Sequence, residues 1–452
     1  MSGSHEEAFM PDQDARAETA RDESQTRPGG YAWYVATMLM LIYTLSLLDR
    51  KLPFILVQSI KHDLALSDTQ IGLLTGVMFA LVYSTLAIPI ASLADRASRK
   101  NIIIVALLVW SCLTSLGGFA MGFWQLSATR LGVAAGEAAC SPAGHSMMAD
   151  YFSPRFRGRA MGLYFLGGQL GLLIGLAVGG WINDLANWRV AFFVLGAPGL
   201  ILSLLFAFTV REPRRKEEIA LEKTSIGEAT TALFRQPVFV HMMIGACLFM
   251  FTGGALLAFT PAYLIRTFHI TTTETGLVYG VTAGLAGIFG SLLGGFASDR
   301  LKKYAPWAPL AFVGVTFALS APSLLAAYSA NGLTSCLVLV FFGNLFLMSY
   351  AGPSFSTLQS LVPPRMHAMA SAYLLFALSG IGVSLGPLFV GALSDHFAAE
   401  GIENPLRWAI LLAILPMFWA AVHFWIAARK LRDSIPQHSV ALDPKLSASE
   451  SR

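Results

Sequence analysis

Charged residues are scarce in this sequence. They make up 13% of its 452 residues, about half of the roughly 25% that is typical of soluble globular domains. This composition excludes a single soluble core. Cysteine is also scarce, and its four residues show no Cys-x-x-Cys spacing, which excludes a disulfide scaffold and a zinc site. We expect neither a metal nor a cofactor, and the net charge of +4 is too small to predict a nucleic-acid partner.

Long apolar runs dominate the sequence instead, and 55% of its residues are hydrophobic. A helix of about 20 apolar residues crosses the hydrocarbon core of a membrane, which is about 30 Å thick. Helices are required because backbone groups in lipid must pair within their own segment. Twelve runs reach this length, and we therefore predict an all-α integral membrane protein. The predicted spans are 31–60, 70–94, 101–121, 123–148, 158–182, 189–210, 238–266, 274–298, 306–329, 332–360, 368–393 and 405–428.

The distribution of positive charge predicts the orientation of these spans. Most Lys and Arg residues lie in the two tails or in the loops after even-numbered spans, a bias that is typical of cytoplasmic segments. We therefore expect both termini in the cytoplasm. Residues 1–30 are polar and lack the features of a signal peptide, so they are predicted to form a disordered cytoplasmic tail. Residues 429–452 are predicted to form a second cytoplasmic tail.

The two halves of the chain repeat each other. The connection 211–237 is the longest and most charged, and it separates the six-helix bundle 31–210 from the six-helix bundle 238–428. Its apolar residues predict either a short helix on the inner membrane face or a solvated linker. Duplicated six-helix halves are a transporter architecture, with the substrate site between the halves. The repeated pairs are Asp95-Arg96 with Asp299-Arg300, Pro154-Arg155 with Pro364-Arg365, Gly175 with Gly386, Gly180 with Gly391, and Asp184 with Asp395.

Two motifs resemble the major facilitator superfamily. Ala91-x3-Asp95-Arg96-x2-Arg99-Lys100 is similar to its signature in the loop between spans 2 and 3, and Gly295-x3-Asp299-Arg300 is a second copy. The resemblance implies the major facilitator fold, with two pseudo-symmetric bundles of six helices. The motif residues are expected to form a cytoplasmic gate whose ion pairs hold the outward-open state and break when the protein opens inward. The alternative is that these charges only set the orientation of the spans in the membrane.

Three further stretches resemble the spinster branch of that superfamily, in particular its bacterial homologues. They are Leu48-Asp49-Arg50, 130–142 and 150–154. Members of the branch carry sphingolipids and lysolipids. The resemblance implies a multi-pass protein of the bacterial inner membrane that acts as a monomer with a lipid-like small molecule as its substrate.

Spans 1 and 4 hold ionisable residues, each of which costs about 2.5–3.5 kcal/mol at the centre of a membrane. Because of this cost, we expect these residues to serve a function or a specific contact. Arg130 and Glu137 lie two turns apart on one helix face, about 10 Å along the axis. Asp49 and Arg50 diverge by about 100°, so at most one of them can point straight at the same partner. We predict that these four residues couple transport to protons and contact the substrate. The alternative is a static ion pair that fixes helix packing.

Spans 7 to 12 carry no Asp, Glu, Lys or Arg in their central portions. A cavity that is charged on one side and apolar on the other suits an amphiphile with a polar head and a long tail. Tyr263, Asn344 and Tyr350 are candidates for lining it, although a lone polar residue on such a span is more often a helix-packing contact.

Other classes of protein compete with this interpretation. A proton-coupled carrier of a small organic anion or drug would show the same charges. An integral membrane enzyme acting on lipid is disfavoured, because His145 has no Ser-His-Asp or Cys-His grouping within its span, and we expect no catalytic residues. A channel or receptor would not need duplicated gate motifs. No Walker A sequence is present, which disfavours ATP-driven pumping by this chain alone.

Overall fold

The computed structural model describes residues 28–94, 97–213, 226–363 and 366–441, and all its regular elements in these ranges are helices. The first half of the chain forms helices up to Thr209. They are α2 (Gly30–Asp63), α3 (Asp68–Gly72), the π-helix η1 (Leu73–Val77), α4 (Met78–Ala94), α5 (Arg99–Gly117), α6 (Phe123–Tyr151), α7 (Pro154–Leu185) and α8 (Trp188–Thr209).

The second half begins with a short helix and continues with long ones. Its elements are α9 (Ile226–Phe234), α10 (Pro237–Phe268), α11 (Thr272–Leu301), α12 (Ala308–Ser329), α13 (Leu333–Met348), α14 (Ala351–Leu361), α15 (His367–Leu375), the π-helix η3 (Phe376–Gly382), α16 (Val383–Ala399), α17 (Pro405–Ile414) and α18 (Pro416–Ala441).

Eleven helical segments among the described residues are long and apolar enough to cross a membrane. Several combine neighbouring elements, such as α13 with α14 and α17 with α18. The helix missing from this count is α6, which has 29 residues and holds Arg130 and Glu137. Helix α6 packs against α4 and α5 inside the bundle, and it covers the predicted span 123–148, which brings the count to twelve. Its charged residues lower its mean hydropathy.

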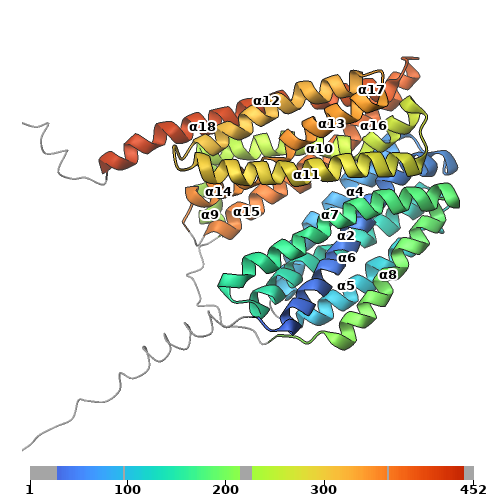
Figure 1. Cartoon of the computed structure of the whole chain (residues 1–452), viewed down its shortest axis with the longest axis horizontal. Coiled ribbons are helices and arrows are strands. Elements are labelled where there is room, and N and C mark those ends of the chain that lie inside the picture. The colour runs from blue at the N-terminus through green and yellow to red at the C-terminus, as the bar shows by residue number, and fades with distance from the viewer. Residues whose placement is uncertain (1–27, 95–96, 214–225, 364–365, 442–452) are drawn as a thin grey trace, which may run out of the picture.

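The helices form two bundles that correspond to the two halves of the sequence (Figure 1). In the first half α2 packs against α7, and α5 packs against α6 and α8. In the second half α10 and α12 both pack against α18. The halves meet where α11 lies against α7 and where α16 lies against α3 and η1. These two contacts join equivalent helices of the repeat, so the interface has the same pseudo-symmetry as the sequence.

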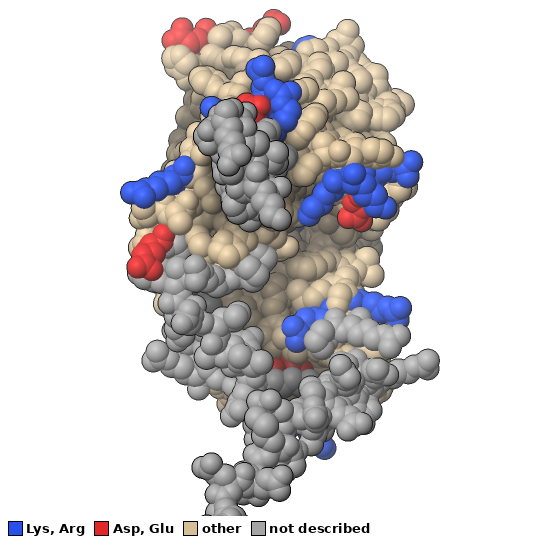
Figure 2. All heavy atoms as spheres, turned by 90° about the vertical axis from the view of Figure 1, so that its left-hand side faces the viewer, with Lys and Arg blue, Asp and Glu red and all other residues tan. Residues whose placement is uncertain are grey.

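The two ends of the bundle differ in charge. The end where α2 and α10 begin, called the terminus end here, carries exposed basic side chains on both halves (Figure 2). The opposite end, called the joined end, has few basic side chains among its described residues. Those exposed at the terminus end include Arg157, Arg159, Arg211, Arg235, Arg300, Lys302, Lys303, Arg429, Lys430 and Arg432.

The segment between the halves contains one helix in its described part, as one of the two sequence alternatives predicts. In α9, Leu233 is fully buried and the Phe234 ring lies 5.5 Å from the rings of Phe239 and Tyr373. Residues 214–225, and most of the predicted tails, lie outside the described residues. The predicted tail that starts at residue 429 begins as a continuation of α18, as far as Ala441.

Candidate functional site

The first-half bundle contains one ion pair that joins α2 to α6. Arg50 donates to the Oε2 atom of Glu137 from Nη2 at 2.8 Å and from Nε at 3.1 Å. The Glu137 side chain has no exposed surface, whereas that of Arg50 is 23% exposed. Of the two adjacent charges on α2, the arginine therefore meets the glutamate. A pair with this burial costs desolvation energy that a pair of apolar side chains would avoid.

Asp49 and Arg130 lie beside this pair and are each only 2% exposed. The charges of Glu137 and Arg130 interact electrostatically with Asp49, and Thr114 and Trp110 of α5 lie near its carboxyl group. Neither Oδ1 of Asp49 nor Nη1 of Arg130 has a hydrogen-bond partner among the described residues. All four predicted residues are thus brought together, in an ionic cluster that holds one formed pair and two further charges.

Aromatic rings from α4 line the cluster. The Arg50 guanidinium lies 4.4 Å from the centre of the Tyr83 ring and 5.0 Å from that of Phe79. The Arg130 guanidinium lies 5.4 Å from the same Phe79 ring. Phe79 therefore contacts both arginines, and cation–π attraction of about 0.5–2 kcal/mol offsets part of their desolvation.

The cluster also borders the other half of the protein. A small cavity of about 30 Å³ is lined by Arg50, Lys51 and Arg130 together with apolar residues, among them Val383 of α16. Lys51 was not among the residues predicted for this site. Three basic side chains thus face a single space at the interface between the halves.

The three candidates for the apolar side of the cavity lie at different places. Tyr263 is buried in the core of its own half, where its hydroxyl group donates to the carbonyl oxygen of Tyr328 at 3.1 Å. Tyr350 is half-buried, with its ring centre 4.3 Å from that of Phe249. Asn344 is half-buried on α13. The predicted cavity-lining roles of Tyr263, Asn344 and Tyr350 stay predictions.

The loop motif after α4 ties elements of the first half together. Arg99 is 2% exposed and donates to Asp150 at 2.5 Å and to Glu212 at 2.9 Å, and Glu212 also accepts from the Lys100 amide at 2.7 Å. Partial burial raises the pKa of the Glu212 carboxyl group. Hydrogen bonds from the Lys100 amide, Arg99 and Ser98 lower this pKa by more, so it lies below its ordinary value. This cluster fastens the start of α5 to the ends of α6 and α8.

The other residues of the two gate motifs make no such contacts in the described part of the chain. Asp95 and Arg96 lie outside the described residues. Asp299 and Arg300 are exposed at the end of α11 and form no ion pair with a described residue.

Two equivalent joints connect the halves at the joined end. In one, Asp184 at the end of α7 accepts from the Thr273 amide at the start of α11, at 2.6 Å. In the other, Asp395 of α16 accepts from the amides of Asp68 and Thr69 at the start of α3, at 2.9 and 2.7 Å. A carboxylate is favourable at a helix N-terminus, where amides lack intrahelical partners. The sequence repeat contains both aspartates, but its pattern alone did not assign them this contact.

Glycine allows the close approach that each joint needs. A Cβ atom on Gly180 would lie 2.5 Å from the Thr272 carbonyl oxygen, and one on Gly391 would overlap the Asp68 carbonyl oxygen. Larger side chains at these positions would hold the halves apart. The small residues of α7 and α16 therefore serve the interface between the halves.

One of the two joints carries additional charges. Asp68 accepts two hydrogen bonds from Arg266 of α10, at 2.8 and 2.9 Å, one from Lys61 at 2.5 Å and one from Ser394 at 2.7 Å. The equivalent position in the other joint is Thr272. Asp68 thus links α2, α3, α10 and α16, and single-sequence reasoning did not find it because its partners are far apart in the chain.

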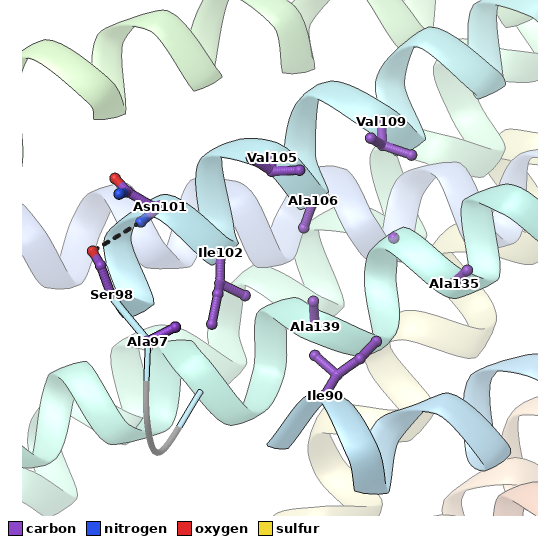
Figure 3. Close-up of a pocket in the computed structure, with 11 residues that line it drawn as sticks. Ile90, Ala97, Ser98, Asn101, Ile102, Val105, Ala106, Val109, Ala135 and Ala139 are labelled. Carbon is purple, nitrogen blue, oxygen red and sulfur yellow. Dashed lines mark hydrogen bonds between the residues drawn. The ribbon is translucent and has the colours of Figure 1, made fainter. Parts of the chain in front are cut away.

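An apolar groove of about 530 Å³ lies between α4, α5 and α6 (Figure 3). Val105 and Val109 of α5 are exposed and line it, together with Ala135, Gly136 and Ala139 of α6. Glu137 projects from a different face of α6. The groove and the ionic cluster are therefore separate features.

The remaining candidate chemistry is sparse. The His145 ring packs against the rings of Tyr164 and Phe165, with centres 5.0 and 5.7 Å away. Within the described ranges, no three His, Cys, Asp or Glu side chains group closely enough to hold a metal ion.

Two bundles of membrane-spanning helices, joined through repeated contacts and enclosing an ionic cluster, define a membrane transporter. The sequence model of the Major Facilitator Superfamily matches residues 39–387, and the chain belongs to this family.

Within the family the chain is similar to spinster proteins and to an efflux pump. The structure of a bacterial homologue of the human lysosomal transporter Spinster, in an inward-facing and unoccupied conformation, matches with a TM-score of 0.82 and 29% identity. The match covers 89% of this chain and 98% of that one. Human protein spinster homolog 1 is 28% identical over 394 residues, covering 82% of this chain and 74% of that protein. An MFS-type efflux pump of Mycolicibacterium smegmatis is 34% identical over 408 residues, covering 89% and 94%.

Proposed function

We propose that this protein is a proton-coupled secondary active transporter that moves an amphiphilic, lipid-like substrate by alternating access. The lysolipids and sphingoid phosphates are the substrate class that we favour. The observation that carries the proposal is the buried Arg50–Glu137 pair beside Asp49 and Arg130. Charges are costly at membrane depth and usually serve function there.

The joints at the joined end support an inward-open state. The terminus end carries exposed basic side chains on both halves, which is typical of a cytoplasmic face (Figure 2). The likeness to the inward-facing spinster homologue agrees with this orientation. Breaking the two joints while the terminus end closes would expose the interface cavity to the other side of the membrane.

The loop motifs are our candidates for the gate at the terminus end. In this conformation Asp299 and Arg300 are exposed and unpaired with respect to the described residues, as a released gate would be. Asp95, Arg96, Arg99 and Lys100 are its expected partners in the first half. The Arg99 cluster would then hold the first-half side of the gate rigid in both states.

Proton coupling follows from competition for Arg50. An anionic headgroup that reaches the Arg50 guanidinium would compete with Glu137 for it, and the interface cavity of about 30 Å³ that Arg50 lines must widen to admit such a group. A proton on Glu137 removes its negative charge and so frees Arg50 to bind the anion. Proton binding and anion binding therefore strengthen each other, and this linkage is reciprocal.

The substrate class follows from the asymmetry of the cavity. Its basic side chains come from the first half, while the second half contributes Val383 and carries no Asp, Glu, Lys or Arg in the central parts of its spans. An anionic head would bind the first half, and an apolar tail would lie against the second.

A small organic anion or a drug is the second candidate substrate. A probable L-galactonate transporter of Escherichia coli, 26% identical over 379 residues, favours this alternative, because L-galactonate is a small organic anion. It requires the same basic residues but no apolar surface for a tail.

Transport into proteoliposomes tests the proposal. The purified protein is assayed across a pH range with lysolipids, sphingoid phosphates and small organic anions. We expect saturable, pH-dependent uptake of one of the lipids. Asp49→Asn and Glu137→Gln should reduce coupled transport while leaving expression intact, and Arg130→Ala should weaken binding of an anionic headgroup. Glu403→Gln, at an exposed position in the loop before α17, is the control.

The outcomes separate the alternatives. Uptake limited to the organic anions would select the second candidate. Normal pH-dependent transport in both carboxylate variants would refute the coupling assignment, and unchanged affinity in Arg130→Ala would remove Arg130 from the site. Chemical conversion of a lipid would indicate an enzyme.

A further inference from the structure

The apolar groove between α4, α5 and α6 lies where two consecutive helices do not meet. Among the described residues, α4 and α5 both pack closely against α6 but hardly against each other. Figure 3 shows Ile90 of α4, Ile102 and Ala106 of α5, and Ala139 of α6 pointing toward the space between the three helices. The volume of about 530 Å³ is within the range of about 300–1,000 Å³ that is usual for sites that bind small molecules.

The groove opens sideways, on a surface that contacts lipid. Helix α5 is long and apolar enough to cross a membrane, and it packs against α6 and α8 of its own half. Its lining residues Val105 and Val109 are 59% and 43% exposed. Val109 lies ten positions after Arg99, the first residue of α5, which corresponds to about 15 Å along the helix. Since the hydrocarbon core is about 30 Å thick, the groove extends through the depth of one leaflet.

Polar groups line the groove at one end only. Ser98 and Asn101 lie where α5 begins, and the Asn101 side chain is exposed. This is the terminus end, because Ser98 donates to Glu212 at 2.9 Å and the neighbouring Arg211 amide donates to Tyr31, at the start of α2, at 2.8 Å. The other lining residues are alanine, glycine, isoleucine and valine. The groove thus has the polarity of an amphiphile whose head lies at the membrane surface.

We propose that this groove binds one acyl chain of a bilayer phospholipid from the leaflet at the terminus end, with the headgroup beside Ser98 and Asn101. Most of the lining offers water no hydrogen-bond partner, whereas a hydrocarbon chain needs none. The groove faces the bilayer and not the interface between the halves. The phospholipids of that leaflet surround the protein at a far higher concentration than a transported lipid, and they are therefore the occupant.

A bound chain would fill the gap between α4 and α5 and hold both helices in one arrangement on α6. Helix α4 also supplies the Phe79 and Tyr83 rings that contact Arg50. The bilayer would thus take part in fixing one wall of the ionic cluster. The inference does not depend on the proposed function, because the groove lies on a different face of α6 from Glu137.

Photo-crosslinking in liposomes tests this inference. The full chain is reconstituted in phosphatidylethanolamine and phosphatidylglycerol, with a small fraction of phosphatidylethanolamine that carries a diazirine in the middle of one acyl chain. After irradiation, the lipid adducts are mapped by peptide mass spectrometry. We expect them to concentrate on residues 101–109 and 135–139. Native mass spectrometry of the purified protein should show one phospholipid that remains bound after the detergent is removed.

Two variants fill the groove from opposite sides. Ala135→Phe adds a ring from α6, and Val109→Phe adds one from an exposed position of α5, where it leaves the core of the bundle unchanged. Each should lower the adducts in both segments about tenfold, because overpacking a filled site costs about 1–3 kcal/mol. The matched controls are Ala197→Phe on α8 and Leu116→Phe on α5, both at exposed positions outside the groove lining, and they should keep the wild-type pattern.

Adducts spread evenly over the exposed apolar residues of all helices would overturn the inference and show general lipid contact only. An unchanged pattern in both Ala135→Phe and Val109→Phe would overturn it as well. Suppression of the adducts by a small fraction of unlabelled lysolipid would assign the groove to a transported lipid instead of a bilayer phospholipid. The proposed function fails separately, in the uptake assay, if both carboxylate variants transport with normal pH dependence.

Discussion

Asp395 accepts two hydrogen bonds from Thr69, one from its backbone amide at 2.7 Å and one from its hydroxyl group at 2.6 Å. The bonds cross from the second half of the protein to the first. Because Asp184 and Thr273 repeat this contact with the halves exchanged, the joined end is held by two copies of one joint. The strength of these joints should decide how often that end opens.

Asp395→Ala should weaken one joint. Loss of a capping carboxylate costs about 1–2 kcal/mol, which corresponds to a change of about 5- to 30-fold in the ratio of open to closed joined ends. The ratio is measured by electron paramagnetic resonance distances between spin labels at positions 186 and 403, after replacement of the native cysteines. Glu400→Ala, at an exposed position five residues beyond Asp395, is the control. An unchanged distance distribution in Asp395→Ala would contradict the role of the joint.

Gly276→Val should force the joined end open. A Cβ atom at Gly276 would overlap the Leu176 carbonyl oxygen across the interface, and overpacking of this kind costs about 1–3 kcal/mol. We expect the population with a closed joined end to fall about tenfold in the same distance measurement. Gly284→Val lies on the same helix, where a Cβ atom meets no atom within 4 Å, and should behave as wild type. Equal behaviour of the two variants would show that close packing at Gly276 is not required.

Arg50→Met should destabilise the protein by about 3 kcal/mol, because it leaves the fully buried Glu137 carboxylate without its counter-charge. Adding Glu137→Gln should recover most of this loss, since the carboxylate that lost its counter-charge is then neutral. Denaturant titration of both variants in detergent gives the two free energies of unfolding. If the double variant is no more stable than Arg50→Met, the pair does not stabilise the fold in the manner proposed.

The stabilising effect of Glu212 should depend on pH. Its pKa in the folded protein lies below the ordinary value of 4.5. The stability it contributes is therefore complete above that value and is lost as the pH falls through the lowered pKa of the folded state. Glu212→Gln should lower the unfolding temperature at neutral pH, and the difference from wild type should shrink in acid. A difference that stays constant from neutral to acidic pH would contradict this account. Lys100→Ala, which keeps the backbone amide that Glu212 accepts from, is the control.

Much of the fold could be predicted from the sequence because each span is a long apolar run and the halves repeat. The composition of α6 shows the limit of that reasoning. It is predicted as a span by its length, but Arg130, Glu137 and its small residues leave it below the hydropathy of the other eleven. The interruptions at η1 and η3 had no predicted counterpart, since local widening of a helix depends on its neighbours in space. Both π-helices lie where the halves meet, with η1 against α16 and η3 against α4.

The candidate site could be predicted in its membership but not in its pairing. Asp49 and Arg50 are neighbours in sequence, and only the rotation of α2 decides that Arg50 reaches Glu137. The repeat of Asp184 and Asp395 was visible, but the backbone amides that they bind leave no trace in a side-chain pattern. Asp68 and Arg266 are nearly two hundred positions apart, so their contact depends entirely on how the halves are assembled.

The capping aspartates bind mainly to the main chain, and this has an evolutionary consequence. Every residue except proline offers the same amide, so mutation at position 273 leaves the acceptor's partner in place, and the amide of residue 69 persists even if its hydroxyl group is lost. Relatives with other residues at positions 69 and 273 should therefore keep both joints, provided that the aspartates and the glycines at the joints are retained.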